Sequence, residues 1–228
     1  FMVAKRNELL GDFAALMQKR NLSGSDPTKQ AYVLEMNGGS NPNEMQWVLA
    51  RDAFVRNDSV IDDERFYLFN VGLNGTEGLA YFITNGYVDK TTAYNRTVQA
   101  TETPVLIGGF QAMDIAEVVA FNSTVNVAQT LIVHEYLAAK YGLMLTDGTG
   151  PVNMYTHDEF IYDLVGVGMT ANLTAEGSDE HLHSTGGAFE LQATGFASEG
   201  DFVLAAHNGL PTTEGGNKVW DRRWYVQT

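Results

Sequence analysis

Carboxylates are the first residues to test for chemistry, because a retaining glycanase needs two of them about 5 Å apart, one as nucleophile and one as acid. Along a strand, alternating spacing such as E-x-D-x-E would place them on one face. No such triplet occurs in the sequence. Asp114 and Glu117 have an odd spacing that puts them on opposite faces, and residues 62–64 (Asp-Asp-Glu) are typical of a solvated turn. We therefore predict a protein without catalytic residues.

Residue types also suggest metal ligands. In a strand, His181 and His183 would share one face, and with a carboxylate from the string DEHLH (179–183) they could hold zinc. No third distant ligand accompanies them, so an exposed polar loop is the favoured interpretation. Residues 37–44 (NGGSNPNE) and the loop from Asp147 to Asn153 offer carboxylate, amide and backbone oxygens, which calcium prefers. Calcium is therefore kept as a candidate cofactor, although neither stretch follows an EF-hand pattern.

Aromatic residues in or near predicted loops are the candidates for carbohydrate recognition, which needs an exposed ring beside polar groups. They are Trp47, Tyr87 and Tyr94. For each of them, partly buried packing is the favoured alternative. Trp220 and Trp224 share a strand face near the end of the chain and are assigned to a core or a domain interface.

Six sequons of the form N-x-[ST] are present, which makes the chain a candidate glycoprotein if its source has a glycosylation system. Their asparagines are Asn21, Asn57, Asn74, Asn95, Asn122 and Asn172. For Asn122, an alternative is that its side chain caps the helix predicted after it, with Ser123 and Thr124 as rival caps.

Composition excludes several function classes. The 228 residues carry a formal net charge of -14 and no basic stripe, which argues against nucleic acid as a partner. Cysteine is absent, so disulfides, thiolate metal sites and a cysteine nucleophile are excluded. No apolar run approaches the roughly 20 residues that span a bilayer. Hydrophobic residues make up 44% of the chain, enough for a well-packed core.

The pattern of short apolar runs and frequent turns predicts a β-sandwich with one helix. Strands are expected at 31–36, 66–73, 78–84, 105–107, 115–121, 160–167, 188–193, 202–206 and 219–226. Asn85-Gly86 predicts a tight hairpin after the third of these runs. Residues 126–141 lack Pro and Gly and stop at Gly142, which predicts a helix with Val127, Leu131, Leu137, Ala138 and Tyr141 buried. A packed, hydrogen-bonded His134 is favoured within it.

Two segments of the sequence carry a family resemblance. The stretch IGGFQAMDIAEVVAFN (107–122), continued by EYLAAKYGL (135–143), resembles the end of laminin-G-like, concanavalin A-like domains of bacterial surface proteins. In that family a glycine-rich turn precedes a D-I-A-E-V-I-x-Y-N strand, and a short helix closes the domain. Residues 66–71, 81–86 and 103–109 look like the preceding strands. The resemblance covers about residues 1–145 and implies a jelly-roll-type sandwich.

The remainder of the chain, through 162–168, 201–208 and 222–227, is similar to a domain of unknown function that often follows the first in secreted bacterial proteins. That family usually has an Arg-Asp pair after its Gly-x-Gly step, whereas this chain has Met169-Thr170. We therefore predict two domains, a sandwich at 1–145 and a smaller β domain at 146–228, with the boundary in the loop at 146–151.

Taken together, these features predict a non-catalytic, extracellular or cell-surface adhesion or carbohydrate-binding region of a larger protein. The expected partners are a glycan or another surface protein, further domains of the same protein, and further copies of the chain. Two alternatives remain: a structural subunit of an extracellular filament or surface layer, and an accessory region of a polysaccharide-degrading enzyme.

Overall fold

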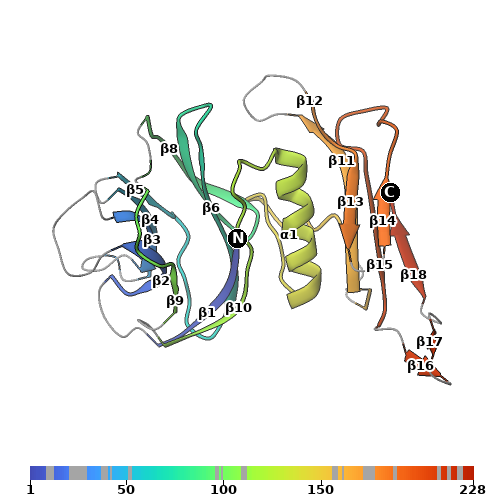
Figure 1. Cartoon of the computed structure of the whole chain (residues 1–228), viewed down its shortest axis with the longest axis horizontal. Helices are drawn as coiled ribbons and strands as arrows, with labels where there is room; N and C mark the ends of the chain where they lie inside the picture. Colours follow the sequence, from blue (N-terminus) through green and yellow to red (C-terminus); the bar gives the residue numbers. More distant parts are fainter. Residues whose placement is uncertain are drawn as a thin grey trace. The chain divides into compact units, whose positions relative to one another are not determined.

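The computed structural model describes residues 1–8, 13–20, 30–36, 41, 43–50, 53–95, 98, 100–108, 112–155, 159–160, 162–171, 178–186, 189–209, 212–214, 217–219 and 223–228. These residues form antiparallel β-sheets and one helix (Figure 1), which confirms a predominantly β protein. The chain divides into two compact units, unit 1 (Phe1–Thr124) and unit 2 (Val125–Thr228), each of which has its own core.

Unit 1 consists of two five-stranded sheets. The first sheet has the order β10-β1-β6-β7-β8, with β1 Met2–Glu8, β6 Phe66–Asn74, β7 Leu79–Thr84, β8 Tyr87–Ala93 and β10 Ala112–Val118. The second sheet has the order β5-β4-β3-β2-β9, with β2 Ala15–Arg20, β3 Gln30–Met36, β4 Met45–Leu49, β5 Ala53–Arg56 and β9 Leu106–Ile107.

The core of unit 1 lies between these sheets, because alternate side chains of each strand point inward. Phe69 and Phe82 come from the first sheet, and Leu34, Met45 and Trp47 come from the second. The predicted hairpin is confirmed: Asn85 and Gly86 both adopt positive φ, 49° and 87°, as a tight turn between β7 and β8 requires.

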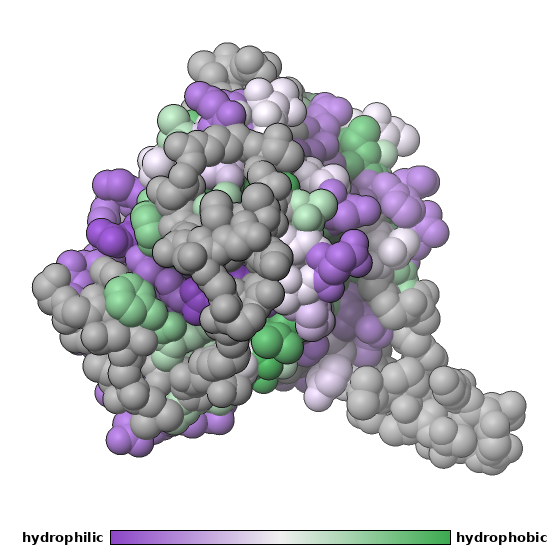
Figure 2. Space-filling view, turned by 60° about the vertical axis from the view of Figure 1, so that its left-hand side comes forward, coloured by the Kyte–Doolittle hydropathy of each residue, from purple (hydrophilic) through white to green (hydrophobic). Residues whose placement is uncertain are grey.

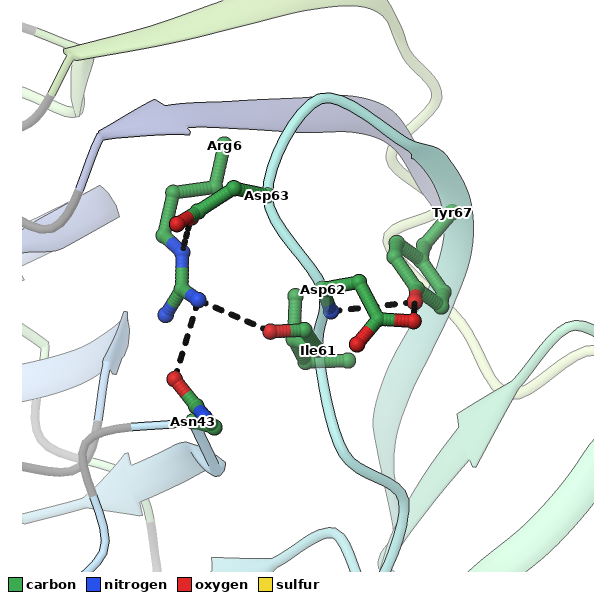
Figure 3. Close-up of polar contacts among 6 residues, drawn as sticks. All are labelled: Arg6, Asn43, Ile61, Asp62, Asp63 and Tyr67. Atoms are coloured by element: carbon green, nitrogen blue, oxygen red, sulfur yellow. Dashed lines mark hydrogen bonds and ion pairs between the residues drawn. The ribbon is translucent and has the colours of Figure 1, made fainter.

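A buried arginine ties one end of this sandwich together (Figure 3). Arg6, on β1, is 3% exposed and donates to the Asp63 carboxylate, to Asn43 Oδ1 at 3.0 Å and to the Ile61 carbonyl at 2.9 Å. Beside it, the Asp62 backbone N–H donates to the Tyr67 hydroxyl at 3.0 Å. The acidic string 62–64 was predicted to be a solvated turn. It is exposed, but it also anchors the β5–β6 connection to β1.

Unit 2 consists of a four-stranded sheet with a helix packed on one face, and of two small hairpins. The sheet order is β12-β11-β15-β18, with β11 Tyr162–Ala171, β12 Ser178–His181, β15 Phe202–His207 and β18 Trp224–Gln227. The helix is α1 (Val127–Tyr141), and the hairpins are β13 (His183–Gly186) with β14 (Phe189–Gln192) and β16 (Thr212–Glu214) with β17 (Asn217–Val219). No helix in the described part of the chain is long and apolar enough to cross a membrane.

Both ends of α1 follow from local sequence. Asn126 is the N-cap: its side chain accepts from the Gln129 N–H at 2.7 Å, and the Gln129 side chain accepts from the Asn126 N–H at 3.0 Å. Gly142 ends the helix in the left-handed region, φ 62°. The predicted helix is thus confirmed, but its cap is Asn126 and none of the residues 122–124.

The helix packs within unit 2, on a sheet face where glycine makes room for it. A Cβ on Gly166 of β11 would overlap Leu204 of β15 and touch Ile132 of α1. The predicted division at residue 146 assigned α1 to the first domain, whereas the compact units divide at Thr124, because the partners of the helix lie much later in the chain. Leu137 and Ala138 are buried as predicted, but Ala128 and Ile132 are buried in place of Val127, Leu131 and Tyr141, which are partly exposed.

Two ionisable side chains of α1 are buried next to each other in sequence. His134 is 1% exposed, and burial lowers its pKa to about 3. Glu135 is also 1% exposed, and burial raises its pKa to about 7, although its carboxylate accepts from the backbone N–H groups of Met154 and Tyr155. Glu135 therefore holds the loop after the helix against α1.

We expect Glu135→Gln to destabilise the protein most at low pH. The folded state holds the Glu135 proton up to about pH 7, whereas an unfolded glutamate loses it near pH 4.5, so wild-type stability falls as pH rises through this window. The glutamine lacks that titration, and its amide NH2 would face a backbone N–H donor. His134 titrates in both proteins and cancels. Urea unfolding at pH 5, 6 and 8 measures the difference between them; a difference that widens with pH would contradict the raised pKa.

Candidate functional site

A chain of polar side chains crosses the second sheet of unit 1 on the face away from the core. Its members are Gln18 and Arg20 on β2, Glu35 on β3, Gln46 on β4 and Arg56 on β5, and we call it the polar ladder. Strand alternation places Glu35 and Gln46 there, because Leu34, Met36, Met45 and Trp47 fill the core. On β2, a register shift between Ala15 and Met17 pairs Gln18 with Val33 on the same outer face, although Leu16 lies in the core. The register then aligns neighbours, since Glu35 pairs with Gln46 and Gln46 with Arg56.

The ladder is continuous in hydrogen bonds. Arg20 Nε donates to Gln18 Oε1 at 2.6 Å, and Arg20 Nη2 lies 3.2 Å from Glu35 Oε2. Gln46 Nε2 then donates to Glu35 Oε1 at 2.8 Å, and Arg56 Nε donates to Gln46 Oε1 at 3.3 Å. Each side chain therefore fixes the orientation of the next across four strands.

Most of the ladder is buried. Gln18 and Gln46 are each 1% exposed and Glu35 is 3% exposed, beside a small apolar cluster of Ala15, Val33 and Val48. Burial raises the pKa of Glu35, and its bonds to Gln46 and Arg20 oppose this shift. Gln18 Nε2 is a buried donor for which the described residues provide no acceptor. Such a donor is costly unless a water or a ligand satisfies it.

The ladder reaches the surface on β5. Arg56 is exposed, and its guanidinium lies 5.7 Å from the centre of the Phe54 ring, which is 44% exposed. β5 contacts β8 of the first sheet, which carries Tyr87, 39% exposed. On the face drawn in Figure 2, the coloured hydrophobic residues form small groups among hydrophilic ones. A ligand bound at the β5 edge would meet the Phe54 ring and the Arg56 guanidinium together.

Of the aromatic residues predicted for carbohydrate recognition, one is exposed. Trp47 is 6% exposed and packs against Tyr32, because it has the core-facing position of β4 between Met45 and Leu49. Tyr94 is 4% exposed and belongs to the same core. Both residues therefore belong to the core of unit 1, where a sugar cannot reach them. Tyr87 is the one exposed ring of the three. Trp220 lies outside the described residues, and Trp224 is partly buried against Phe189.

The two side chains predicted as calcium ligands, Asp147 and Asn153, form hydrogen bonds with backbone groups of the same loop. Asp147 Oδ1 accepts from the N–H groups of Thr149 and Gly150 at 2.7 and 3.2 Å, and Asn153 accepts from Leu145 N–H and donates to the Leu143 carbonyl. Both side chains therefore hold the backbone of their own loop. Residues 37–40 and 42 and the Asp179 side chain lie outside the described part. Within it, no three His, Asp or Glu side chains are grouped as metal ligands.

The sequons differ in accessibility. Asn57 is 1% exposed, accepts from Met45 N–H at 2.6 Å and donates to the Ser59 carbonyl at 2.9 Å, so a glycan does not fit there. Asn74 forms a turn with Thr76 and Glu77. Asn95 and Asn122 are exposed, and Asn122 does not cap α1. Asn21 and Asn172 lie outside the described residues. Asn57 is thus excluded, and the other five sequons remain candidates for glycosylation.

None of the five ladder residues is among those predicted from the sequence. The signal that could have revealed them is a polar residue set inside an apolar strand, as in AYVLEM (31–36) and MQWVL (45–49). That signal does not show which polar residues meet, because β2, β4 and β5 and their register were not predicted.

No protein-family model matches the chain, and no curated protein or solved structure is significantly similar to it.

Proposed function

We propose that the chain is a non-catalytic binding region of a larger extracellular surface protein, and that unit 1 is a concanavalin A-like sandwich that binds carbohydrate. The observation that carries the proposal is the polar ladder with its exposed Phe54–Arg56 end. A sugar ring has an apolar C–H face and several hydroxyl groups, and an aromatic ring beside a guanidinium suits both. Because the ladder holds Arg56 in place before a ligand arrives, less side-chain entropy is lost on binding.

We expect Phe54→Ala and Arg56→Ala each to weaken glycan binding by about tenfold or more, the size of one lost charged hydrogen bond or stacking contact. A glycan array selects the ligand, and affinity electrophoresis compares the variants. Phe121→Ala is the matched control, since Phe121 is an exposed phenylalanine of unit 1 (49%) outside the ladder. Equal binding by all three variants would remove the β5 edge from the site. Turnover of a polysaccharide that a single carboxylate substitution abolishes would overturn the non-catalytic part.

A structural role in a filament or surface layer is a second candidate, favoured by the edge strand β9. Val105, Leu106 and Ile107 are 44%, 39% and 53% exposed, and an apolar sheet edge pairs readily with a strand of another molecule. Sedimentation of the intact protein over a wide concentration range tests this role, and a strictly monomeric species counts against it.

A further inference from the structure

A row of rings crosses the sheet of unit 2 on the face opposite α1. Tyr162 on β11 pairs with His207 on β15, and His207 pairs with Trp224 on β18. Ring centres of Tyr162 and His207 are 5.8 Å apart at 21°, and those of His207 and Trp224 are 4.8 Å apart. Phe189 of β14 lies 4.7 Å from Trp224 and extends the row. We call these four residues the aromatic row.

A bulge brings a carboxylate to the same face. Consecutive residues of a regular strand point to opposite faces, but the β11–β15 register shifts between Tyr162 and Val165, and Asp163 adopts φ 52°. As a result Asp163 Oδ2 reaches His207 Nε2 at 2.8 Å, on the side where Tyr162 lies. Positive φ is unusual for a residue other than glycine, and such backbones persist where the surrounding structure fixes them.

His207 orients this carboxylate. It is 0% exposed, and its Nδ1 accepts from the Gly209 backbone N–H at 3.3 Å. The ring proton is therefore on Nε2 and points at Asp163 Oδ2, as in pairs where one nitrogen fixes the tautomer of the other. Both ring nitrogens are therefore hydrogen-bonded. The Asp163 side chain is 28% exposed and Tyr162 is 38% exposed, so both reach solvent next to each other.

We propose that unit 2 has a saccharide-binding position of its own, separate from the β5 edge of unit 1. The exposed ring of Tyr162 takes the apolar face of one sugar residue, and Asp163 accepts from an adjacent hydroxyl through the oxygen not bonded to His207. The bulge and the buried histidine position the carboxylate before the ligand binds. An aromatic ring beside a carboxylate also suits an organic ammonium, and we favour the sugar because Asp163 is already a directed hydrogen-bond acceptor.

The test is a titration of the isotope-labelled full chain with cello-, laminari-, xylo-, chito- and mannohexaose, followed through backbone amide chemical shifts. We expect one of them to shift amides 162–164 and 207–209. Tyr162→Ala and Asp163→Asn should each weaken this event by about tenfold, while Tyr162→Phe keeps it. Asn still accepts from His207 and tolerates positive φ, so Asp163→Asn retains the bulge.

Shifts confined to amides around Phe54 and Arg56 would overturn this second site and leave the proposed function of unit 1 standing. Shifts confined to 162–164 and 207–209 would support this site and count against the β5 edge. If choline or lysine methyl ester shifts amides 162–164 and none of the hexasaccharides does, the ligand class is wrong. An unchanged spectrum with every probe overturns both proposals.

Discussion

Arg6→Met is expected to lower the free energy of unfolding of unit 1 by about 3 kcal/mol. Methionine fills much of the space of the arginine stem, so little cavity is left, but the three bonds of the guanidinium are lost. The Asn43 amide oxygen and the Ile61 carbonyl then lose the donor that the Arg6 side chain provides, and Asp63 loses its ion pair, although the Glu64 N–H still donates to the Arg6 carbonyl. The effect is large because Arg6 is buried and joins segments from both sheets.

Lys5→Met is the matched control for this prediction. Lys5 precedes Arg6 on β1 and also contacts acidic residues, Glu64 at 2.9 Å and Asp114 at 3.2 Å, but these pairs are at the surface. Surface ion pairs contribute little, so its loss should be much smaller. Urea unfolding of both variants, with the transition of unit 1 followed through amide signals, measures the difference. Similar losses for Lys5→Met and Arg6→Met would show that burial of Arg6 is not the source of its contribution.

Gly168→Ala is expected to destabilise unit 2 by about 1–3 kcal/mol, as overpacked cores do. Gly168 of β11 pairs with Phe202 of β15, and a Cβ at this position would overlap the Phe202 ring. The backbone of Gly168 is outside the positive-φ region, so alanine itself suits the strand and the loss arises from the ring.

Gly150→Ala is its control, because nothing lies within 4 Å of the added Cβ and φ is again not positive. The second test is the double variant Gly168→Ala/Phe202→Ala. If the overlap is the cause, the two losses should be clearly non-additive, since removing the ring removes the clash. Additive losses in thermal unfolding would assign the effect of Gly168→Ala to some other cause.

Features set by neighbouring residues could be predicted from the sequence. The helix that ends at Gly142 and the Asn85-Gly86 hairpin are examples, because each depends on a few adjacent side chains. The polar ladder could not be predicted in this way. Glu35 and Gln46 meet only through the β3–β4 register, and Arg56 joins them only because β5 is paired next. Trp47 was predicted to lie near a loop for the same reason, because the side of the sheet on which its ring lies depends on which face of β4 is covered.

The assignment of α1 to a domain also depended on distant contacts. Its own sequence predicts its length, but its partners Gly166 and Leu204 come after it in the chain. Asp163 is a related case, since nothing local in the sequence marks the bulge that turns it toward His207.

The position of β1 in its sheet sets an order on folding. β1 pairs on one side with β6 and on the other with β10, so its neighbours come from the middle and the far end of unit 1. During synthesis, residues 2–8 cannot be enclosed in the sheet until residues 112–118 are available, whereas the β6–β7–β8 meander can form from adjacent chain. Long loops must close before such pairings are stabilised, which slows folding. The β1–β10 pairing is therefore expected to be among the last contacts of unit 1 to form, whereas the partners of Arg6, which end at Asp63, are available much earlier. A chaperone that shields the free edge of β1 would act over that whole interval.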